Sequence, residues 1–530
     1  MSSDTISFEK TGYFSSLICN YLIEKQELRP FYNRFPSIEN FKAQIEEKQA
    51  LVSSESRVVL SNVLNKQYQN IAASELSLQN IKALRDSNTF TITTGHQLNL
   101  FTGPLYFLYK IVSTINLSTE LKETYPDYNF VPIYWMATED HDFDEINYFN
   151  FKGKKVQWNR DTSGAVGELS TNGLDEVLKV LDNEFGQSTN AEALKKLFKE
   201  AYLEHDNLAD ATRFLANELF KEYGLVIVDA NDAELKELFV PYLRDELLNN
   251  TSFKKVTETN KALSKNYQIQ VSPREINLFY LDKNLRERIV YEGEVFKVLN
   301  TDISWSKNDL LEHLQKVPER FSPNVIMRPL YQEVILPNLC YIGGGGELAY
   351  WMQLKSYFKG VDVTFPMLLL RNSVLIKTEK QAVKLQKLNI SDEDIFLKRH
   401  SFINKKVREI SNIDLSFKSQ KEHLKGQFKG LYELAKLTDK SFVGAVKAQE
   451  LKQIKGLENL EKRLLKAQKK VLSDQVSRMT ELQNKLFPNG SLQERNTNFS
   501  EFYLEYGELL IPTLIKNLKP LKRGFSILTF

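Results

Sequence analysis

The stretch Thr94-Gly95-His96-Gln97-Leu98-Asn99-Leu100-Phe101-Thr102-Gly103-Pro104 decides which fold the sequence predicts. It follows residues 89–93, where apolar and polar side chains alternate as in a half-buried strand. It precedes residues 105–122, whose apolar side chains lie largely on one stripe of a helix. A strand, a glycine-bearing loop and a helix form the first half of a βαβ unit.

A second predicted strand, residues 130–137, ends in the acidic loop 138–145. If both strands are parallel in one sheet, both loops leave from the same edge. That edge, at the carboxyl ends of the strands, is where open α/β sheets bind ligands. We therefore expect the active site where these two loops meet.

Length and composition narrow the class of protein. A chain of 530 residues predicts two or three structural units, and 42% hydrophobic residues suffice for a large core. The net charge of +2 gives no bulk field that favours nucleic acid or membrane. There is no long apolar run and no secretory signal, and only Cys19 and Cys340 are cysteines. We expect a protein of a reducing, cytoplasmic compartment that binds neither nucleic acid nor membrane.

Further segments continue the α/β pattern. Helices are expected before residue 88, and strands at 225–229, 324–327, 339–342 and 365–370 extend the sheet. Residues 151–173 are polar and rich in turns, residues 174–202 are helical, and 275–299 contain a strand hairpin, so we expect insertions at about 151–223 and 230–320. After about 380, Lys-, Gln- and Leu-rich sequence with a heptad-like stripe predicts a helical arm over 381–500. Residues 501–530 form a return segment with a terminal strand.

The loop after the first strand carries His96, Gln97, Thr102 and Gly103 at the start of a predicted helix. The end of a helix binds anions through its free amides and its dipole. The alternative is an ordinary capped turn. The loop has neither a Walker sequence nor a dinucleotide fingerprint, so it does not identify a nucleotide.

The acidic loop contains Glu139, Asp140, Asp142, Asp144 and Glu145 around a single histidine, His141. Clustered carboxylates raise one another's pKa, which brings a general base toward neutrality. The same group is also suited to hold Mg²⁺ or an ammonium group. A solvated acidic loop is the alternative, and no second ligand cluster supports a metal site.

Two more motifs suit ligand binding. Gly343, Gly344, Gly345 and Gly346 before Glu347 would let a ligand approach the main chain, although close helix packing also explains them. Arginine favours bidentate contact with carboxylates, and structural salt bridges are the alternative. The candidates at predicted strand ends are Arg328, Gln332 and Arg371. A serine hydrolase is disfavoured, because no G-x-S-x-G motif is present.

Five motifs in this order resemble one family. They are Thr94-Gly-His-Gln-x5-Gly-Pro-Leu-Tyr, Glu139-Asp-His-Asp-Phe-Asp-Glu-Ile-Asn, Arg328-Pro-Leu-Tyr-Gln, Gly343-Gly-Gly-Gly-Glu-Leu-Ala-Tyr-Trp and Phe487-Pro-Asn-Gly-x-Leu-Gln-Glu-Arg. Together with the helical arm they resemble the cysteine ligase of bacillithiol biosynthesis, the BshC family. The resemblance implies a Rossmann-like core over 1–380 with two insertions, and a coiled-coil domain that mediates a homodimer. The common family form has Gln at the position of His96 and often Pro at that of Gly345.

The resemblance also implies a reaction. The carboxyl group of cysteine would be joined to the amine of glucosaminyl malate. Asp140, His141 and Asp142 would then hold and deprotonate the amine. The anionic or activated end would lie against Gly95, His96, Gln97, Thr102 and the loop of Gly343, Gly344, Gly346 and Glu347. Gly103 and Glu139 would also belong to the substrate-binding site. Arg328, Gln332 or Arg371 would bind the malate carboxylates.

Two other classes of function stay open at this point. One is a metal-dependent hydrolase or nucleotidyl-transfer enzyme that uses the acidic loop. The other is a non-catalytic scaffold whose functional part is the arm. The sequence also leaves open whether ATP, another activating nucleotide or Mg²⁺ takes part.

Overall fold

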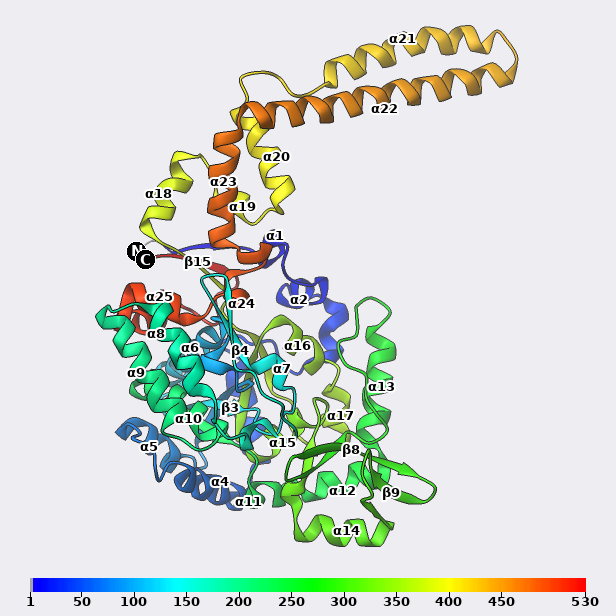
Figure 1. Cartoon of the computed structure of the whole chain (residues 1–530). Coiled ribbons are helices and arrows are strands. Elements are labelled where there is room, and N and C mark those ends of the chain that lie inside the picture. The colour runs from blue at the N-terminus through cyan, green and yellow to red at the C-terminus, as the bar shows by residue number, and fades with distance from the viewer. Residues whose placement is uncertain (1–2) are drawn as a thin grey trace.

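The computed structural model describes residues 3–530 and consists of an α/β body from which a helical arm projects (Figure 1). The body is built on five parallel strands in the order β13-β12-β2-β3-β6. Their bounds are β2 Thr89–His96, β3 Asn129–Met136, β6 Val226–Asp229, β12 Asn338–Gly343 and β13 Met367–Leu370. The predicted parallel pairing of the first two strands is confirmed, with Gly95 opposite Trp135 and His96 opposite Met136.

The order of the strands places a switch point next to β2. From β2 the chain moves outward to β3 and β6, and then returns to the other side of β2 for β12 and β13. Loops that leave β2 and β12 therefore diverge, which opens a crevice at their carboxyl ends. The fold class predicted from the sequence, a Rossmann-like parallel sheet with inserted subdomains and a helical coiled-coil domain, is confirmed.

Helices cover both faces of this sheet, which explains why its strands are almost wholly buried. Apolar residues of α6 Tyr106–Thr124 and α10 Leu208–Phe220 pack with Tyr134 and Ile227 on one face. Those of α4 Ser54–Gln67 and α5 Glu75–Ala83 pack with the alternate residues of β3 and β6 on the other. Further helices of the body are α1 Phe8–Thr11, α2 Ser16–Leu22, α3 Asn40–Gln49, α16 Gly345–Trp351 and α17 Lys355–Gly360.

Two insertions interrupt the sheet. The first contains α7 Phe143–Ile146, the hairpin of β4 Tyr148–Phe151 and β5 Lys154–Gln157, and the helices α8 Leu174–Phe185, α9 Thr189–Leu203 and α10. The second carries a sheet in the order β10-β9-β8-β7-β11. Its elements are α11 Ala233–Glu237, α12 Val240–Asn249, α13 Thr251–Leu263, β7 Leu278–Asp282, β8 Leu285–Glu292, β9 Val295–Val298, β10 Ser304–Trp305, α14 Lys307–Lys316 and β11 Phe321–Pro323.

The strand predicted at residues 324–327 is wrong. The short strand β11 lies just before it and pairs antiparallel with β7 in the inserted sheet, not with the main sheet. Asn324 then turns the chain, because its side-chain oxygen accepts the N–H of Ile326 at 2.8 Å. Pro329 lies in the first turn of α15 Arg328–Ile335, where a missing N–H has no cost. Arg328 and Gln332 therefore belong to a helix and not to a strand end.

The segment after β13 forms a small sheet, the arm and the return to the body. β14 Val374–Lys377 joins β1 Ser3–Ile6 and β15 Phe525–Thr529, so the predicted terminal strand is confirmed. The arm is a hairpin of α21 Lys418–Lys436 and α22 Lys440–Val471 on a base of α18 Glu379–Lys387, α19 Asp392–Ile395, α20 Arg399–Ile410 and α23 Ser473–Leu486 (Figure 1). The return comprises α24 Gln493–Asn496, α25 Phe499–Tyr506 and α26 Leu510–Asn517.

Candidate active site

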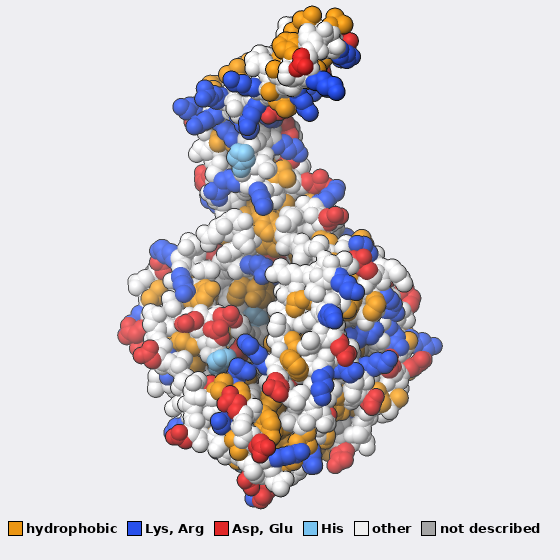
Figure 2. Space-filling view, turned by 90° about the vertical axis from the view of Figure 1, so that its right-hand side faces the viewer, with side chains coloured by type: hydrophobic (Ala, Val, Ile, Leu, Met, Phe, Trp, Pro, Cys, Tyr) orange, Lys and Arg blue, Asp and Glu red, His pale blue; other side chains and the backbone are white. Residues whose placement is uncertain are grey.

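A cavity of about 720 Å³ lies at the carboxyl ends of the five parallel strands. It receives Gly95 from β2, Ala137 from the end of β3, Ala230 after β6, Gly344 after β12 and Arg371 after β13. The inserted sheet supplies a second wall, and the space-filling view shows a hollow near the middle of the body with charged side chains at its rim (Figure 2). The cavity therefore occupies the switch point at which open α/β sheets bind ligands.

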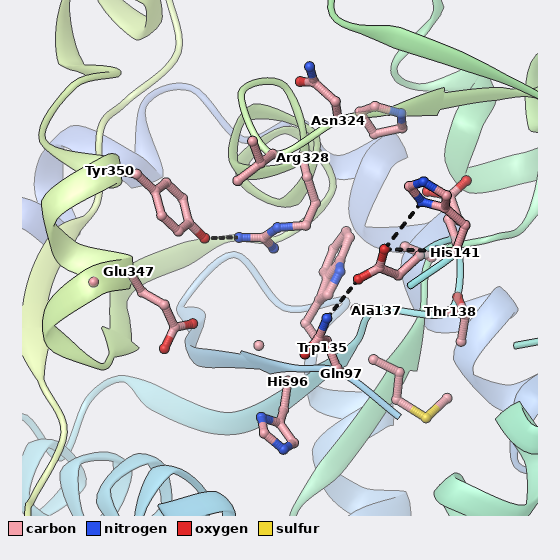
Figure 3. Close-up of a pocket in the computed structure, with 18 of the residues that line it drawn as sticks. His96, Gln97, Trp135, Ala137, Thr138, His141, Asn324, Arg328, Glu347 and Tyr350 are labelled. Atoms are coloured by element: carbon pink, nitrogen blue, oxygen red, sulfur yellow. Dashed lines mark hydrogen bonds and ion pairs between the residues drawn. The ribbon is translucent and has the colours of Figure 1, made fainter. Parts of the chain in front are cut away.

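Asp140 is held as an anion on the β3 side of the cavity. Its carboxylate accepts the side chain of Gln97 at 2.9 Å and the N–H of His141 at 2.8 Å (Figure 3). Burial works to raise the pKa of Asp140, but these hydrogen bonds and the charge of Arg286 hold it well below its usual range. The predicted mutual raising of pKa values in this loop is therefore wrong for Asp140, because donors surround it.

His141 is fixed as a hydrogen-bond acceptor. Its Nδ1 lies 2.5 Å from an Arg286 guanidinium nitrogen and 3.6 Å from Asp140 Oδ1. Because arginine only donates, the Nδ1 atom facing Arg286 carries a lone pair and the proton of the neutral ring is on Nε2. Arg286 stacks over Phe279 at 3.9 Å, which keeps both in place.

Glu139 differs from its neighbour Asp140. It pairs with Lys236, whose side chain is fully buried and also donates to the carbonyl of Phe321 at 2.8 Å. Burial raises the pKa of Glu139, and the charge of Lys236 opposes that rise without cancelling it. Of the two adjacent carboxyl groups, Glu139 thus has the higher pKa and is the better proton acceptor.

A closed ion-pair network occupies the β12 side. Buried Lys110 contacts Glu347 at 2.7 Å and donates to the carbonyl of Gly95 at 2.6 Å. Glu347 also accepts the hydroxyl of Tyr341 at 2.7 Å and the N–H of Gly344 at 2.8 Å. Burial works against the charge on Glu347, but Lys110 and the other donors lower its pKa overall, so it stays ionised. The N–H of Gly344 is thereby used within the protein and not left for a ligand.

Arg328 lies between these two regions without a carboxylate partner within residues 3–530. It stands 5.7–5.9 Å from the rings of Tyr341, Trp135 and Trp351. Its guanidinium donates to Gln332 at 3.1 Å and to the Tyr350 hydroxyl at 3.4 Å (Figure 3). Aromatic faces support the cation while leaving its charge available to an anion.

Arg371 instead forms a structural salt bridge. It contacts both carboxylate oxygens of Glu494 at 2.8 and 3.1 Å, and both side chains are almost completely buried. Glu494 belongs to the segment that follows the arm, and the next residue, Arg495, also lines the cavity. Of the two alternatives left by the sequence, the salt bridge is the one observed, although Arg371 Nε has no partner.

His96 is buried and neutral. Its ring packs against Tyr106 and Phe107, and burial together with the charge of Lys110 lowers its pKa to about 3. Its Nε2 atom has no hydrogen-bond partner in the described part of the chain. A neutral imidazole offers a hydrogen bond to a ligand but no charge.

The structure brings most predicted site residues to this cavity. Those that line it are Gly95, His96, Gln97, Glu139, Asp140, His141, Arg328, Gly344, Gly346, Glu347 and Arg371. Thr102, Gly103, Asp142, Gln332 and Gly343 do not line it.

The predicted site residues that do not line the cavity lie on the surface or in the core of the protein. Asp142 is exposed and precedes α7, whose residues Phe143 and Ile146 enter the core and turn the chain. Thr102 and Gly103 belong to a buried turn with positive φ, and the carbonyl of Thr497 takes the N–H of the nearby Leu105 at 2.7 Å. The N–H of Leu105 is therefore not free to bind an anion, and Thr102 and Gly103 lie outside the cavity. Gln332 is buried behind Arg328, and Gly343 permits the close packing of Leu348.

The sequence did not indicate several lining residues. Arg274, Arg286 and Arg288 come from the second insertion, Arg495 from the return segment, and Lys110, Tyr341 and Tyr350 from elements of the core. Lys110 could have been predicted from the sequence, because it lies near the start of the predicted helix that follows the glycine loop. The arginines had none, since their approach depends on tertiary structure.

Among residues 3–530, no three or more His, Cys, Asp or Glu side chains are grouped so that they could hold a metal ion. No helix in the same range is long and apolar enough to cross a membrane.

Comparison with known proteins identifies the family. Residues 1–372 match the family model "Bacillithiol biosynthesis BshC, N-terminal Rossmann-like domain", and residues 374–530 match "Bacillithiol biosynthesis BshC, C-terminal coiled-coil domain". The chain is 62% identical over 529 residues to "Putative cysteine ligase BshC" of Flavobacterium johnsoniae, covering 100% of both chains. It is 27% identical over 513 residues to the Bacillus cereus protein of that name, covering 93% of this chain and 94% of that one.

Similarity to solved structures adds nothing to this identification. A crystal structure called "putative arginyl t-RNA synthetase" from Campylobacter jejuni covers 85% of this chain and 99% of its own, with 11% identity and a TM-score of 0.20. A score this low supports no shared fold.

The fold is an α/β fold with a large cavity at the switch point of a Rossmann-like sheet, as in enzymes that bind small molecules there. The chain belongs to the BshC family of bacillithiol biosynthesis. The family resemblance predicted from the motifs is confirmed, and so is the predicted enzyme class, since the curated relatives are named ligases.

Proposed function

We propose that the chain joins the carboxyl group of cysteine to the amine of glucosaminyl malate. Family membership and the name of the relatives support the cysteine half of this reaction. The amine substrate comes from the resemblance and carries an amine and two carboxylates. The same proposal places the enzyme in the cytoplasm, where low-molecular-weight thiols stay reduced.

The observation that carries the proposal is the distribution of charge in the cavity. Glu139 and Asp140 line the cavity at the end of β3. The cavity is also lined by arginines that have no carboxylate within 4 Å in residues 3–530. These arginines are Arg274, Arg286, Arg288, Arg328 and Arg495. A ligand with one ammonium group and several carboxylates complements this arrangement, because each of its charges finds an opposite charge.

Asp140 would hold the amine and Glu139 would take its proton. Asp140 remains ionised because of its donors, so it is a strong acceptor for an ammonium group but a weak base. The raised pKa of Glu139 suits it to accept a proton. His141 would assist as a donor through Nε2, because Arg286 occupies Nδ1.

Arg328 would bind a malate carboxylate. Its charge is not neutralised by the protein, and the neighbouring glycines leave space for the ligand. A Cβ atom at Gly346 would meet no heavy atom within 4 Å, whereas one at Gly95 would lie 3.3 Å from the Tyr341 hydroxyl and 3.8 Å from Arg328. A substrate can therefore approach the main chain beside Arg328.

The test is turnover by the purified full-length protein. Cysteine and glucosaminyl malate are incubated with and without ATP, and the product is followed by mass. A new species with the combined mass less one water is expected. If no such species forms under either condition, or if it forms equally without the protein, the proposed reaction is wrong.

We also propose that two copies associate through the arm. Several apolar side chains of the α21–α22 hairpin are exposed, as expected of a helical face that a second copy covers. They are Leu431, Leu434, Leu437, Phe442, Val443, Leu451, Leu460 and Val471. Light scattering should give a dimer mass for the full chain and a monomer mass after removal of residues 418–471. A monomeric full chain would contradict this proposal.

A further inference from the structure

The segment that follows the arm brings Arg495 into the cavity. Its motif, Phe487 to Arg495, contributed to the family resemblance but received no role from the sequence. Arg495 is exposed, lines the cavity, and has no hydrogen-bond or ion-pair partner for its guanidinium within residues 3–530. A cation at a cavity wall without a protein anion is suited to bind an anion of the ligand.

Two side-chain clamps fix this segment on either side of Arg495. Gln493 accepts the N–H of Ile376 at 2.9 Å and donates to the carbonyl of the same residue at 2.9 Å. Asn498 donates to the carbonyls of Phe101 at 2.8 Å and Gly103 at 2.7 Å. The backbone that carries Arg495 is therefore ordered by the fold, which lowers the entropy cost of binding a ligand there.

Arg371 adds a second donor in the same region of the cavity, because its guanidinium lies 4.9 Å from the Tyr106 ring and the charges of both Arg371 and Arg495 act on the Tyr106 hydroxyl. Its Nη atoms are used by Glu494, but its Nε atom is buried without a partner in the described chain. The side chain is 3% exposed and lines the cavity. A buried N–H without an acceptor is costly, and a ligand oxygen would satisfy it.

The balance of charge at this corner favours an anion. Arg371 is neutralised by Glu494, and Lys110 is neutralised by Glu347. Arg495 then leaves one uncompensated positive charge beside the free donor of Arg371. This corner lies at the end of β13, three strand spacings from Asp140 at the end of β3, which is about 14 Å.

We propose that Arg495 and the Nε group of Arg371 form an anion-binding corner that takes a carboxylate or phosphate group of a substrate. The proposal rests on the proposed function for the identity of that substrate. A malate carboxylate and the phosphate of an activating nucleotide share the required chemistry, namely oxygen atoms with negative charge. Arg495 is a substrate-binding residue in this proposal, and Glu494 positions the corner by holding Arg371.

The experiment measures binding without turnover, so its failure is separable from failure of the proposed reaction. The full-length protein is titrated calorimetrically with L-malate and, separately, with inorganic pyrophosphate at constant ionic strength. The variants are Arg495→Gln, Arg495→Lys, and Arg463→Gln as a control at an exposed position of α22 with the same change of charge. Thermal unfolding verifies that each variant is folded.

The wild-type protein is expected to bind at least one probe, and Arg495→Gln to weaken that binding about tenfold while Arg463→Gln leaves it unchanged. Arg495→Lys should fall between them, because lysine keeps the charge but loses the planar fork. Weakened binding of malate alone identifies a carboxylate, and weakened binding of pyrophosphate alone a phosphate. The proposal is overturned if the wild type binds neither probe, or if Arg495→Gln and Arg463→Gln bind equally well.

Discussion

The two ends of the cavity use charge in different ways. At the β12 and β13 end, Lys110 pairs with Glu347 and Arg371 pairs with Glu494, and each cation is almost completely buried. At the β3 end, Asp140 has hydrogen-bond donors but no Lys or Arg nitrogen within 4 Å in residues 3–530. Paired buried charges build the walls of the cavity, whereas Asp140, Arg328 and Arg495 have no Lys, Arg, Asp or Glu partner within 4 Å in residues 3–530, and we propose that their charges bind the ligand.

This difference predicts which substitutions damage stability and which damage binding. Removing one member of a buried pair leaves the other charge uncompensated, which unfolds a protein more readily than it alters catalysis. Removing a charge that has no Lys, Arg, Asp or Glu partner within 4 Å should cost less stability, because no close ion pair is broken.

The largest effect is expected at the paired end. Glu494→Gln leaves buried Arg371 without a counter-charge, so we expect the free energy of unfolding to fall by about 3 kcal/mol. Urea titration of the full chain measures it. Glu508→Gln, at an exposed position of the same return segment, is the matched control and should change stability little. Equal stability of the two variants would show that the Arg371–Glu494 pair does not hold the return segment.

The next effect is expected at the ligand-facing end. Asp140→Asn removes the anion that holds the amine while keeping the shape of the side chain, so kcat/KM should fall by about a hundredfold with little change in unfolding. Asp142→Asn is a close control, since Asp142 is two residues away but exposed and outside the cavity. The assignment fails if Asp142→Asn is as inactive as Asp140→Asn.

A smaller effect is expected at Arg328. Arg328→Lys retains the positive charge but loses the two-pronged geometry, and KM for glucosaminyl malate should rise about tenfold while kcat changes little. Arg320→Lys serves as the control, because Arg320 pairs with Asp282 at the surface and does not line the cavity. An unchanged KM in Arg328→Lys would remove Arg328 from carboxylate binding.

Local pattern predicts one wall of this cavity but not the other. The loops after β2 and β3 could be placed together because parallel strands align their carboxyl ends, and Gly95, Gln97 and Asp140 follow from that rule. Arg286 and Arg495 could not be predicted, because an antiparallel hairpin and a segment beyond the arm reach the cavity only through tertiary packing.

Two local patterns were misleading for physical reasons. The apolar run Val325-Ile326-Met327 has the composition of a strand, but Asn324 starts a turn and Pro329 starts a helix around it. The acidic loop suggested that Asp142 acts together with Asp140 and His141. A high density of acidic residues does not determine which side chains face the cavity. Phe143 is buried in the core, and Asp142 beside it remains on the surface.

The smallest effect on activity near neutral pH is expected at His96. The residue is already neutral there, since its pKa is lowered to about 3, and the resemblance indicates that Gln is common at this position. We expect His96→Gln to change kcat/KM by less than about threefold, measured in the ligation assay. A loss as large as that of Asp140→Asn would show that the imidazole itself is required.

The same variant should change how stability depends on pH. In the wild type, the unfolded chain takes up a proton at His96 below its ordinary pKa of 6.5, while the folded chain resists protonation down to about 3. The stability that neutral His96 permits is therefore present above pH 6.5 and is lost as the pH falls toward 3. Glutamine does not titrate, so the His96→Gln variant lacks this pH-dependent contribution. Between pH 6.5 and 3, the free energy of unfolding of the variant should therefore decline less steeply than that of the wild type, with slopes that differ by up to about 1.4 kcal/mol per pH unit. Urea titrations across the window measure both slopes, and parallel slopes would mean that His96 titrates in the folded protein as it does in the unfolded chain.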